Sequence, residues 1–414
     1  MLDWKQDTTG IMSTTTPQTS DPQQEALGQR NAEAVKAASP ASVHLDAVRG
    51  LAALVVFLNH WRALFFADYS QLSHPSIAAK VFYALTGLGH SAVMVFFILS
   101  GFFISSSVFR AFGQGRWSWG WYAEQRLTRL YVVLIPALVL GAGWDLFGTH
   151  LFGRTPVYLD AADYHLMLKL PVAQMDTAQA WLGSLFFLQG IRTPVFGSNG
   201  PLWSLSYEFW YYVLFPVGLL AVSRKSGVAA KIAYGAAALL ILVFIGKYIA
   251  LYFLIWLLGT LLCLCPPLRL AASRMLGAVS GLLFVVFLLA PRFKLMPPGI
   301  LDDFLVAAAF AAFLLWLLNA NYAAPGTLYT RAARALSNIS YSLYLIHVPV
   351  LVFLNALIIR QGSRWQPSGL HLGAGVLVAG AVFLYTYGIW YFTEARTAQV
   401  RAKIISLLSK RAAA

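Results

Sequence analysis

The sequence predicts an all-α, polytopic integral membrane protein, and three observations support this prediction. Hydrophobic residues make up 59% of the 414 residues and charged residues only 11%, whereas a soluble globular protein carries about 25% charged residues. Apolar stretches of the roughly 20 residues that cross a bilayer recur along the chain. Lys and Arg gather in alternate segments between these stretches. The net charge of +14 therefore indicates membrane topology and not nucleic-acid binding.

About ten segments are apolar and long enough to be transmembrane helices. They are 47–66, 88–109, 127–149, 201–223, 228–246, 248–265, 275–291, 300–319, 337–359 and 370–393. One further stretch, AWLGSLFFLQGI at 180–191, is too short to span and predicts a re-entrant or interfacial helix. With the N-terminus inside, the inner segments hold roughly twice as many Lys and Arg residues as the outer ones, so both termini are predicted to face the cytoplasm.

The chain divides into one membrane domain and two tails. Residues 1–42 are polar and lack the apolar core of a signal peptide, which predicts a disordered cytoplasmic tail. Residues 43–394 form the membrane domain, and 395–414 form a basic cytoplasmic tail. The two cysteines, Cys263 and Cys265, would point to different faces of a helix and cannot bridge each other. The histidines and cysteines show no metal-ligand spacing, so no metal is expected.

The first predicted span, HLDAVRGLAALVVFLNHW at 44–61, carries ionisable residues that a bilayer disfavours. Arg49 and His60 are eleven residues apart, which places them on one helix face about 16 Å apart along the axis. Asn59 is turned away from that face, and Asp46 can pair with Arg49 three residues later. Singly, Arg49 could snorkel to the phosphates and His60 could be a packed core residue. Together they favour a polar path through the membrane.

An arginine pair stands at the inner end of the third span, in QRLTRLYVVLIP. Arg126 and Arg129 are three residues apart and so share one helix face. Two guanidinium forks on one face suit phosphate binding. The alternative is a topology signal only, because inner loops are basic in any case.

A carboxylate lies inside the span that begins in SNGPLWSLSYEFWYYVLFP at 198–216. Glu208 is expected in the outer half of the membrane, at a depth similar to His60, where it needs a partner. The alternative is a structural ion pair with Arg192 or Lys169. Trp203 belongs to an aromatic cluster that is either an interfacial belt or a platform for a sugar ring.

Two further spans contain polar residues with helical spacing. In SNISYSLYLIHVPV, one stripe leads to a histidine, and this predicts either a functional face or hydrogen bonds between helices. The stripe comprises Ser337, Ser340, Tyr341, Tyr344 and His347. In FFILSGFFIS, Ser100 and Gly101 predict close helix packing, and no nucleophile-elbow spacing surrounds the serine.

These blocks, in this order, resemble the acyltransferase-3 family of bacterial membrane O-acyltransferases over residues 43–394. The first-helix signature of that family is an Arg followed, after ten residues, by a His. The resemblance implies a ten-helix enzyme of the bacterial cytoplasmic (inner) membrane. Such enzymes move an acyl group, usually acetyl from cytoplasmic acetyl-CoA, to a hydroxyl of a sugar. That sugar belongs to a surface glycan, an exopolysaccharide or a lipid-linked precursor.

The resemblance also implies roles for particular residues. His60 is the catalytic histidine with Arg49 as its partner in the motif, Arg126 and Arg129 are the cytoplasmic arginine pair, and Glu208 falls in the later acidic block. We expect the CoA phosphates to dock at these three arginines, with Asp46 holding Arg49. His60 would act as a general base or carry the acyl group, oriented by Glu208. The residues expected to contact the acceptor are Asn59, Trp203, Tyr341 and His347.

Two other functions fit a membrane protein with buried charge. A transporter or flippase for a lipid-linked sugar is one, but the sequence lacks the inverted repeat and paired interrupted helices of such proteins. The other membrane O-acyltransferase class also uses an intramembrane histidine, but it fits the first-helix Arg–His pair poorly.

Overall fold

The computed structural model describes residues 40–159, 162–164, 167–168, 170–265, 273–319 and 327–413. Within these residues the regular elements are helices, and β pairing is limited to two isolated bridges. Nine helices in the described ranges are long and apolar enough to cross a membrane. The predicted all-α, polytopic membrane fold is therefore confirmed.

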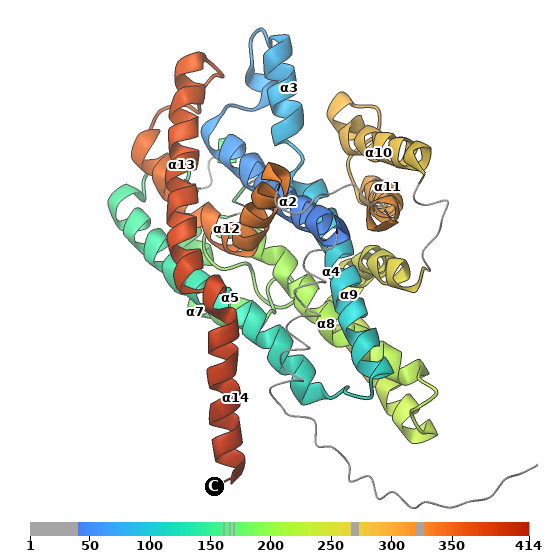
Figure 1. The fold of residues 1–414 in the computed structure, drawn as a ribbon. Coiled ribbons are helices and arrows are strands. Elements are labelled where there is room, and N and C mark those ends of the chain that lie inside the picture. Colours follow the sequence, from blue (N-terminus) through green and yellow to red (C-terminus); the bar gives the residue numbers. More distant parts are fainter. Residues whose placement is uncertain are drawn as a thin grey trace, which may run out of the picture.

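The long helices cover the predicted spans, and α2, α5 and α12 begin well before them (Figure 1). Their bounds are α2 (Pro40–Phe65), α4 (Gly89–Gly113), α5 (Trp119–Phe152), α8 (Trp203–Val222), α9 (Val228–Leu264), α10 (Arg274–Leu289), α11 (Ile300–Asn319), α12 (Leu328–Ile358) and α13 (Gly369–Phe392). The shorter helices are α3 (Ile77–Thr86), α6 (Val172–Met175), α7 (Ala178–Leu185) and α14 (Thr397–Ala413). The short helix expected at 180–191 is thus present as α7.

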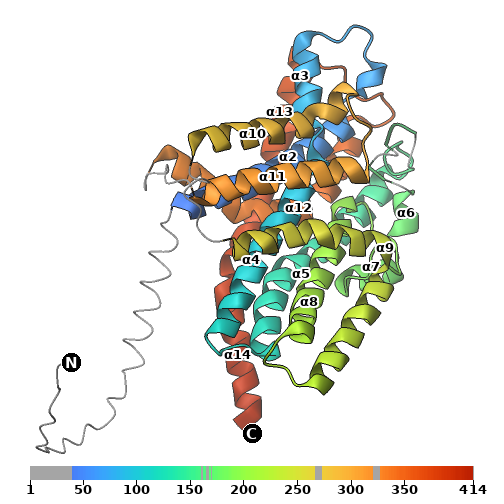
Figure 2. The ribbon, with the colours of Figure 1, turned by 90° about the vertical axis from the view of Figure 1, so that its right-hand side faces the viewer.

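Helix α9 bends sharply in its middle, and Figure 2 shows its two arms. Gly246 has φ 79° and ψ 169° at the bend, a conformation that glycine adopts without a steric penalty. The two spans predicted at 228–246 and 248–265 are the two arms of this one helix.

Helices α2 and α12 lie side by side in the interior of the bundle (Figure 1). They approach closely at Gly50, where an added Cβ would lie 2.6 Å from the Leu336 Cβ. Helix α4 packs on another side of α2, and α5 packs on another side of α12. Of the candidate spans, α12 is the most buried, with 72% of its apolar window inside the protein. Polar side chains that face each other from α2 and α12 are therefore shielded from lipid.

Small residues bring α4 and α9 together, as the Ser100–Gly101 pair predicts. A Cβ added at Gly101 would collide with the Trp256 carbonyl oxygen, and one added at Gly259 would collide with the Ile98 carbonyl oxygen. The Trp256 indole N–H donates to Ser100 Oγ at 3.2 Å. The close approach leaves the Ser100 hydroxyl facing α8.

The chain between α7 and α8 enters the bundle instead of running over its surface. Ser198 is fully buried, and its backbone N–H and hydroxyl donate to the Asp145 carboxylate at 2.7 and 2.6 Å. Asn199 donates to the Leu345 carbonyl, in the middle of α12, at 2.7 Å. Helix α8 therefore begins deep inside the protein, and its side chains lie deeper than a surface start would place them.

The two predicted tails differ in what the structure shows of them. Residues 1–39 of the N-terminal tail lie outside the described residues. Thr397–Ala413 of the basic C-terminal tail form α14, which extends away from the bundle (Figures 1 and 2). The orientation with both termini inside stays a prediction.

Candidate active site

Two histidines from α2 and α12 form a hydrogen-bonded pair. His60 Nδ1 lies 2.8 Å from His347 Nε2, and the two rings are within 18° of parallel. His347 is fully buried, and its Nδ1 lies 2.7 Å from the Leu343 carbonyl oxygen. The Phe57 ring packs edge-on against His347, with centroids 5.8 Å apart. His60 keeps part of its surface open.

This geometry determines which nitrogen of His60 can act as a base. A carbonyl oxygen only accepts, so His347 Nδ1 must carry the proton, and Nε2 of the neutral ring must accept. His60 Nδ1 is then the donor between the rings, which leaves the lone pair of neutral His60 on Nε2. Within the described residues that nitrogen has no hydrogen-bond partner. His60 is thus held in one tautomer, with a basic nitrogen free for a substrate.

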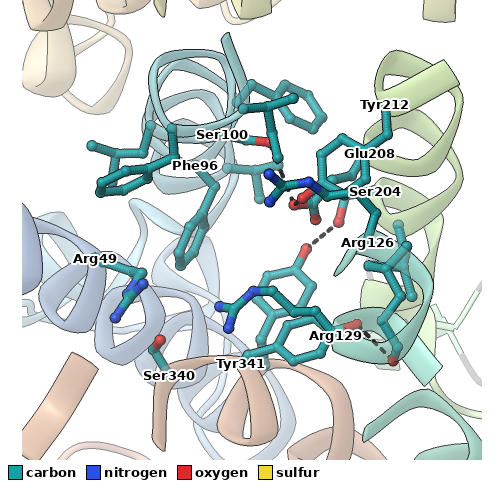
Figure 3. Close-up of a pocket in the computed structure, with 18 residues that line it drawn as sticks. Arg49, Phe96, Ser100, Arg126, Arg129, Ser204, Glu208, Tyr212, Ser340 and Tyr341 are labelled. Atoms are coloured by element: carbon teal, nitrogen blue, oxygen red, sulfur yellow. Dashed lines mark hydrogen bonds between the residues drawn. The ribbon is translucent and has the colours of Figure 1, made fainter. Parts of the chain in front are cut away.

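A cavity of about 170 Å³ opens between α2, α4, α5, α8 and α12 (Figure 3). Its apolar walls include Phe96, Phe97 and Leu130. Its polar lining consists of Arg49, Ser100, Arg126, Arg129, Ser204, Glu208, Tyr212, Ser340, Tyr341 and Tyr344. Among the lining residues, three guanidinium groups accompany one carboxylate, a set that can bind an anionic ligand.

The first cavity arginine comes from α2 and is held from both sides. Arg49 Nη2 lies 3.2 Å from the Asp46 carboxylate, as the three-residue spacing predicts. Its Nε donates to Ser337 Oγ at 2.7 Å, and Ser337 in turn donates to Asp46 at 2.8 Å. Asp46 and Ser337 therefore fix the guanidinium that Figure 3 shows at the edge of the cavity.

The other two cavity arginines come from α5. Arg126 donates to Ser107 Oγ at 2.8 Å, and its guanidinium lies 5.4 Å from the Tyr122 ring. Arg129 lies over the Tyr341 ring at 5.7 Å and makes no hydrogen bond with the described part of the chain. The predicted pair thus faces one cavity together with Arg49, and the Arg129 fork is available to a ligand.

Glu208 lies with the arginines, and the structure does not bring it to His60. Its carboxylate accepts from the Tyr212 hydroxyl and, at 3.4 Å, from Ser100, and the charges of Arg129 and Arg126 act on it. The expected similar depth of Glu208 and His60 is wrong, because α8 begins at the level of Leu345 in mid-bundle. Nine residues of helix beyond Asn199 lower Glu208 by roughly 13 Å, to the level of the arginines.

The cavity ends close to the histidine pair. Tyr344 lines it, packs edge-on against Phe96 and exchanges a 2.7 Å hydrogen bond with Ser204. On α12, Tyr344 precedes His347 by three residues, a rise of about 4.5 Å. The arginines and the His60–His347 pair thus lie at two levels along α12, and neither histidine lines the cavity.

The comparison with known proteins gives the family of the chain. A family model described as an acyltransferase domain, that of acyltransferase-3, matches residues 43–393. The chain belongs to the acyltransferase-3 family. No curated protein and no solved structure matches it significantly. The matched range contains the histidine pair and the whole cavity, so this membrane acyltransferase carries both within its family domain.

The remaining residues predicted to contact the acceptor are dispersed in the acyltransferase. Asn59 packs against Gly89 at the start of α4, and Trp203 stacks on His90 at 6.0 Å. Tyr341 lies in the arginine cavity, where its hydroxyl donates to the Leu130 carbonyl at 3.2 Å. His347 bonds to His60. Of this group, only His347 touches the predicted catalytic residue.

Several residues of the site have no distinct sequence signal. Tyr212 and Ser100 donate hydrogen bonds to Glu208. In the sequence, Tyr212 is typical of an aromatic residue at a membrane interface, and Ser100 is typical of a small residue at a helix contact. Glu394 accepts from the backbone N–H and hydroxyl of Ser342 at 3.0 and 2.8 Å, and its charge acts on Arg129. The position of Glu394 after an apolar span was the available clue. Among the described residues, no group of three or more His, Cys, Asp or Glu could hold a metal ion.

Proposed function

We propose that this acyltransferase moves an acyl group, with acetyl as the expected one, from cytoplasmic acyl-CoA to a sugar hydroxyl. The acceptor is a unit of a surface glycan, an exopolysaccharide or its lipid-linked precursor, and His60 is the catalytic residue. The observation that carries the proposal is the position of the arginine cavity relative to the histidine pair on α12. The arginine cavity ends one helical turn below a histidine pair in which one basic nitrogen is free.

The arginine cavity suits the phosphates of a CoA donor. Arginine forks bind phosphate oxygens in pairs, and Arg129 keeps its fork unengaged by the described residues. A cavity of about 170 Å³ holds only part of so large a donor, so the remainder extends toward the inner end of α5. The rise from Arg49 to His60 is about 16 Å, and a long, thin pantetheine arm is the part of the donor that suits this distance.

His60 supplies the proton transfer that an acyl transfer needs. Its Nε2 takes the proton of the acceptor hydroxyl as the hydroxyl oxygen attacks the thioester carbonyl carbon. The carbon–sulfur bond then breaks, and the imidazolium returns the proton to the leaving thiolate. In the covalent variant, Nε2 attacks the thioester carbonyl carbon and CoA leaves as the thiolate. The acceptor hydroxyl then takes the acyl group from the acyl-imidazole, and its proton passes to the freed His60 nitrogen and on to the thiolate. In both routes His347 keeps the lone pair of His60 on the nitrogen that faces the substrate.

The predicted membrane orientation agrees with donor binding at the arginine cavity and acyl transfer at His60. The predicted inner segments, rich in Lys and Arg, place the inner end of α5 in the cytoplasm, where acyl-CoA is made. His60 lies further along α2 toward the opposite face. We place the enzyme in the bacterial cytoplasmic membrane, with the acceptor entering from the outer side.

Transfer from labelled acetyl-CoA by the purified protein tests the function directly. The protein in nanodiscs, given a glycan extract from its host cells, should release CoA and place label on the glycan. In proteoliposomes, movement of a lipid-linked sugar across the bilayer without release of CoA would instead indicate the transporter.

His347 is expected to act as a positioning residue for His60. His347→Leu should lower kcat about tenfold, the value of one hydrogen bond, while the KM for acetyl-CoA stays the same. His347→Gln should restore much of the loss, because its amide oxygen can accept from His60 Nδ1. Asn355→Leu is the matched control, since Asn355 is also buried on α12 and donates to an α2 carbonyl at 2.7 Å. An equal kcat loss in both leucine variants would reduce His347 to a packing role.

Glu208 is expected to position Arg126 and Arg129 and not to act on His60. Glu208→Gln keeps the acceptor oxygen for Tyr212 and Ser100 but removes the charge that holds Arg126 and Arg129 together. The KM for acetyl-CoA should rise about tenfold, while kcat at saturation should change by less than about threefold. Glu124→Gln, a carboxylate on α5 that does not line the cavity, should change neither. A fall in kcat with an unchanged KM would return Glu208 to a role beside His60.

A further inference from the structure

A second hollow of about 610 Å³ lies where the chain leaves α2 and where it enters α13. We call it the loop pocket, and it is lined by Ala67, Gln71, Asp163, residues 362–366 and His371. This end of the bundle is the one where α3 lies, opposite the C-terminal end of α14 (Figures 1 and 2). It shares no lining residue with the arginine cavity. In the proposed orientation the loop pocket faces outward.

The loop pocket is built around a buried arginine that is already neutralised. Arg364 is 5% exposed and donates to the Asp68 carboxylate at 2.8 and 3.3 Å and to the Ala63 carbonyl at 2.9 Å. The Asp163 carboxylate lies 3.8 Å from the same guanidinium. Both carboxylates face the Arg364 guanidinium, so its charge is paired within the protein. This guanidinium is therefore not free to hold an anionic ligand.

Two hydrogen-bond acceptors of the loop pocket are left without a donor, and the Ser363 hydroxyl and Gln366 amide of the lining can both donate and accept. Gln71 donates to one oxygen of Asp163 at 3.0 Å, and the other carboxylate oxygen has no partner among the described residues. His371 Nδ1 lies 2.8 Å from the Gln366 carbonyl and must donate to it, so its Nε2 keeps a lone pair. A ligand that satisfies these groups has to offer several O–H donors.

A stacked aromatic pair stands beside these acceptors. The rings of Trp365 and His371 are within 1° of parallel, with centroids 5.4 Å apart. Backbone bonds hold Trp365 in place, since its N–H donates to the Phe65 carbonyl at 2.8 Å and Ala67 donates back at 3.0 Å. An aromatic face next to hydrogen-bond acceptors suits a pyranose, which has an apolar C–H face and a rim of hydroxyls.

We propose that the loop pocket binds a neutral hexose unit of the acceptor glycan, remote from the unit that is acylated. This inference rests on the proposed function, because it takes a glycan as the acceptor. Ala67 follows His60 by seven residues and lies two residues beyond the end of α2, which places it on the order of 10 Å from His60 along the helix axis. A unit held at that distance does not react, but its binding energy orders the next unit toward His60.

Calorimetry on the full chain in nanodiscs tests the loop pocket without any turnover. The probes are three neutral hexamers, maltohexaose, cellohexaose and mannohexaose, and one acidic hexamer, hexagalacturonate. At least one neutral hexamer should bind, and the acidic one should bind at least tenfold more weakly than that hexamer. Asp163→Ala and His371→Phe should each weaken neutral binding about tenfold. Gln361→Ala is the matched control, because Gln361 is exposed on the same loop and does not line the pocket.

The outcomes separate this inference from the proposed function. Binding by none of the neutral hexamers, or equal binding by the parent, Asp163→Ala and His371→Phe with melting temperatures unchanged, overturns the loop pocket. The proposed function fails separately if the parent transfers no label from acetyl-CoA, whatever it binds. His60→Ala should bind the neutral hexamer like the parent, since His60 does not line the pocket.

Discussion

Replacement of His60 by alanine is expected to lower acyl transfer by about 10²- to 10⁴-fold, the usual contribution of a positioned general base. The affinity for acetyl-CoA should stay the same, because the arginines proposed to bind the donor lie lower in the bundle, with Arg49 about 16 Å from His60 along α2. Transfer is measured with labelled acetyl-CoA and donor binding by calorimetry. The loss should therefore be seen in kcat and not in the dissociation constant of the donor.

The control for this variant is His44→Ala. His44 lies at the inner end of the same helix and bonds to Tyr329 at 2.8 Å, outside the cavity. It should transfer acyl groups like the parent. Near-normal turnover by His60→Ala would contradict the whole mechanism, whatever the family of the chain.

The same pair of proteins separates the two chemical routes. After incubation with labelled acetyl-CoA and denaturation, label that stays on the parent and is missing from His60→Ala indicates an acyl-histidine. Absence of label from both indicates direct transfer with His60 as base.

The α2 helix shows how far sequence reasoning reached. Helical spacing alone places Arg49, Asp46 and His60 in relation to one another, and the Asp46–Arg49 contact is as expected. The tautomer of His60 could not be predicted, because its partner is 287 residues away on α12. The polar stripe on α12 points to His347 but does not say which helix that stripe faces.

The misplacement of Glu208 has a specific physical cause. Residue counting assumes that a span begins at the membrane surface, and α8 does not. The segment that precedes α8 is held inside the bundle by hydrogen bonds from Ser198 to Asp145 and from Asn199 to Leu345. All of these are long-range contacts. Local sequence pattern carries no signal for such contacts. Every residue on α8 therefore lies deeper in the bundle than residue counting predicts.

The helix α9 shows the opposite case, in which a local signal suffices. The sequence analysis separates two spans at Gly246 and Lys247, and the structure bends at Gly246. A glycine with positive φ marks the bend because its neighbours in the helix could not adopt that conformation cheaply.

The arginine pair gives the second large effect. Arg126→Ala combined with Arg129→Ala should weaken acetyl-CoA binding about a hundredfold. Each charge-assisted contact contributes about 1.5 to 3 kcal/mol, and 1.4 kcal/mol corresponds to tenfold. Arg129→Ala should weaken acetyl-CoA binding more than Arg126→Ala does. Arg126 already donates to Ser107, whereas Arg129 has no hydrogen bond among the described residues. Lysine at both positions should restore binding only in part, since the planar fork is lost.

The matched control decides between a phosphate site and a topology signal. Arg110 and Arg116 are exposed, come from the same predicted inner segment and do not line the cavity. If the inner loop attracts the donor only through its net charge, Arg110→Ala with Arg116→Ala should weaken binding as much as the cavity pair does. That general attraction would fade at high salt in both double variants. If the cavity binds the phosphates, the control should bind nearly like the parent and the cavity variant should stay weak at every salt concentration. Unchanged affinity in the cavity variant would mean that Arg126 and Arg129 orient the chain in the membrane and take no part in donor binding.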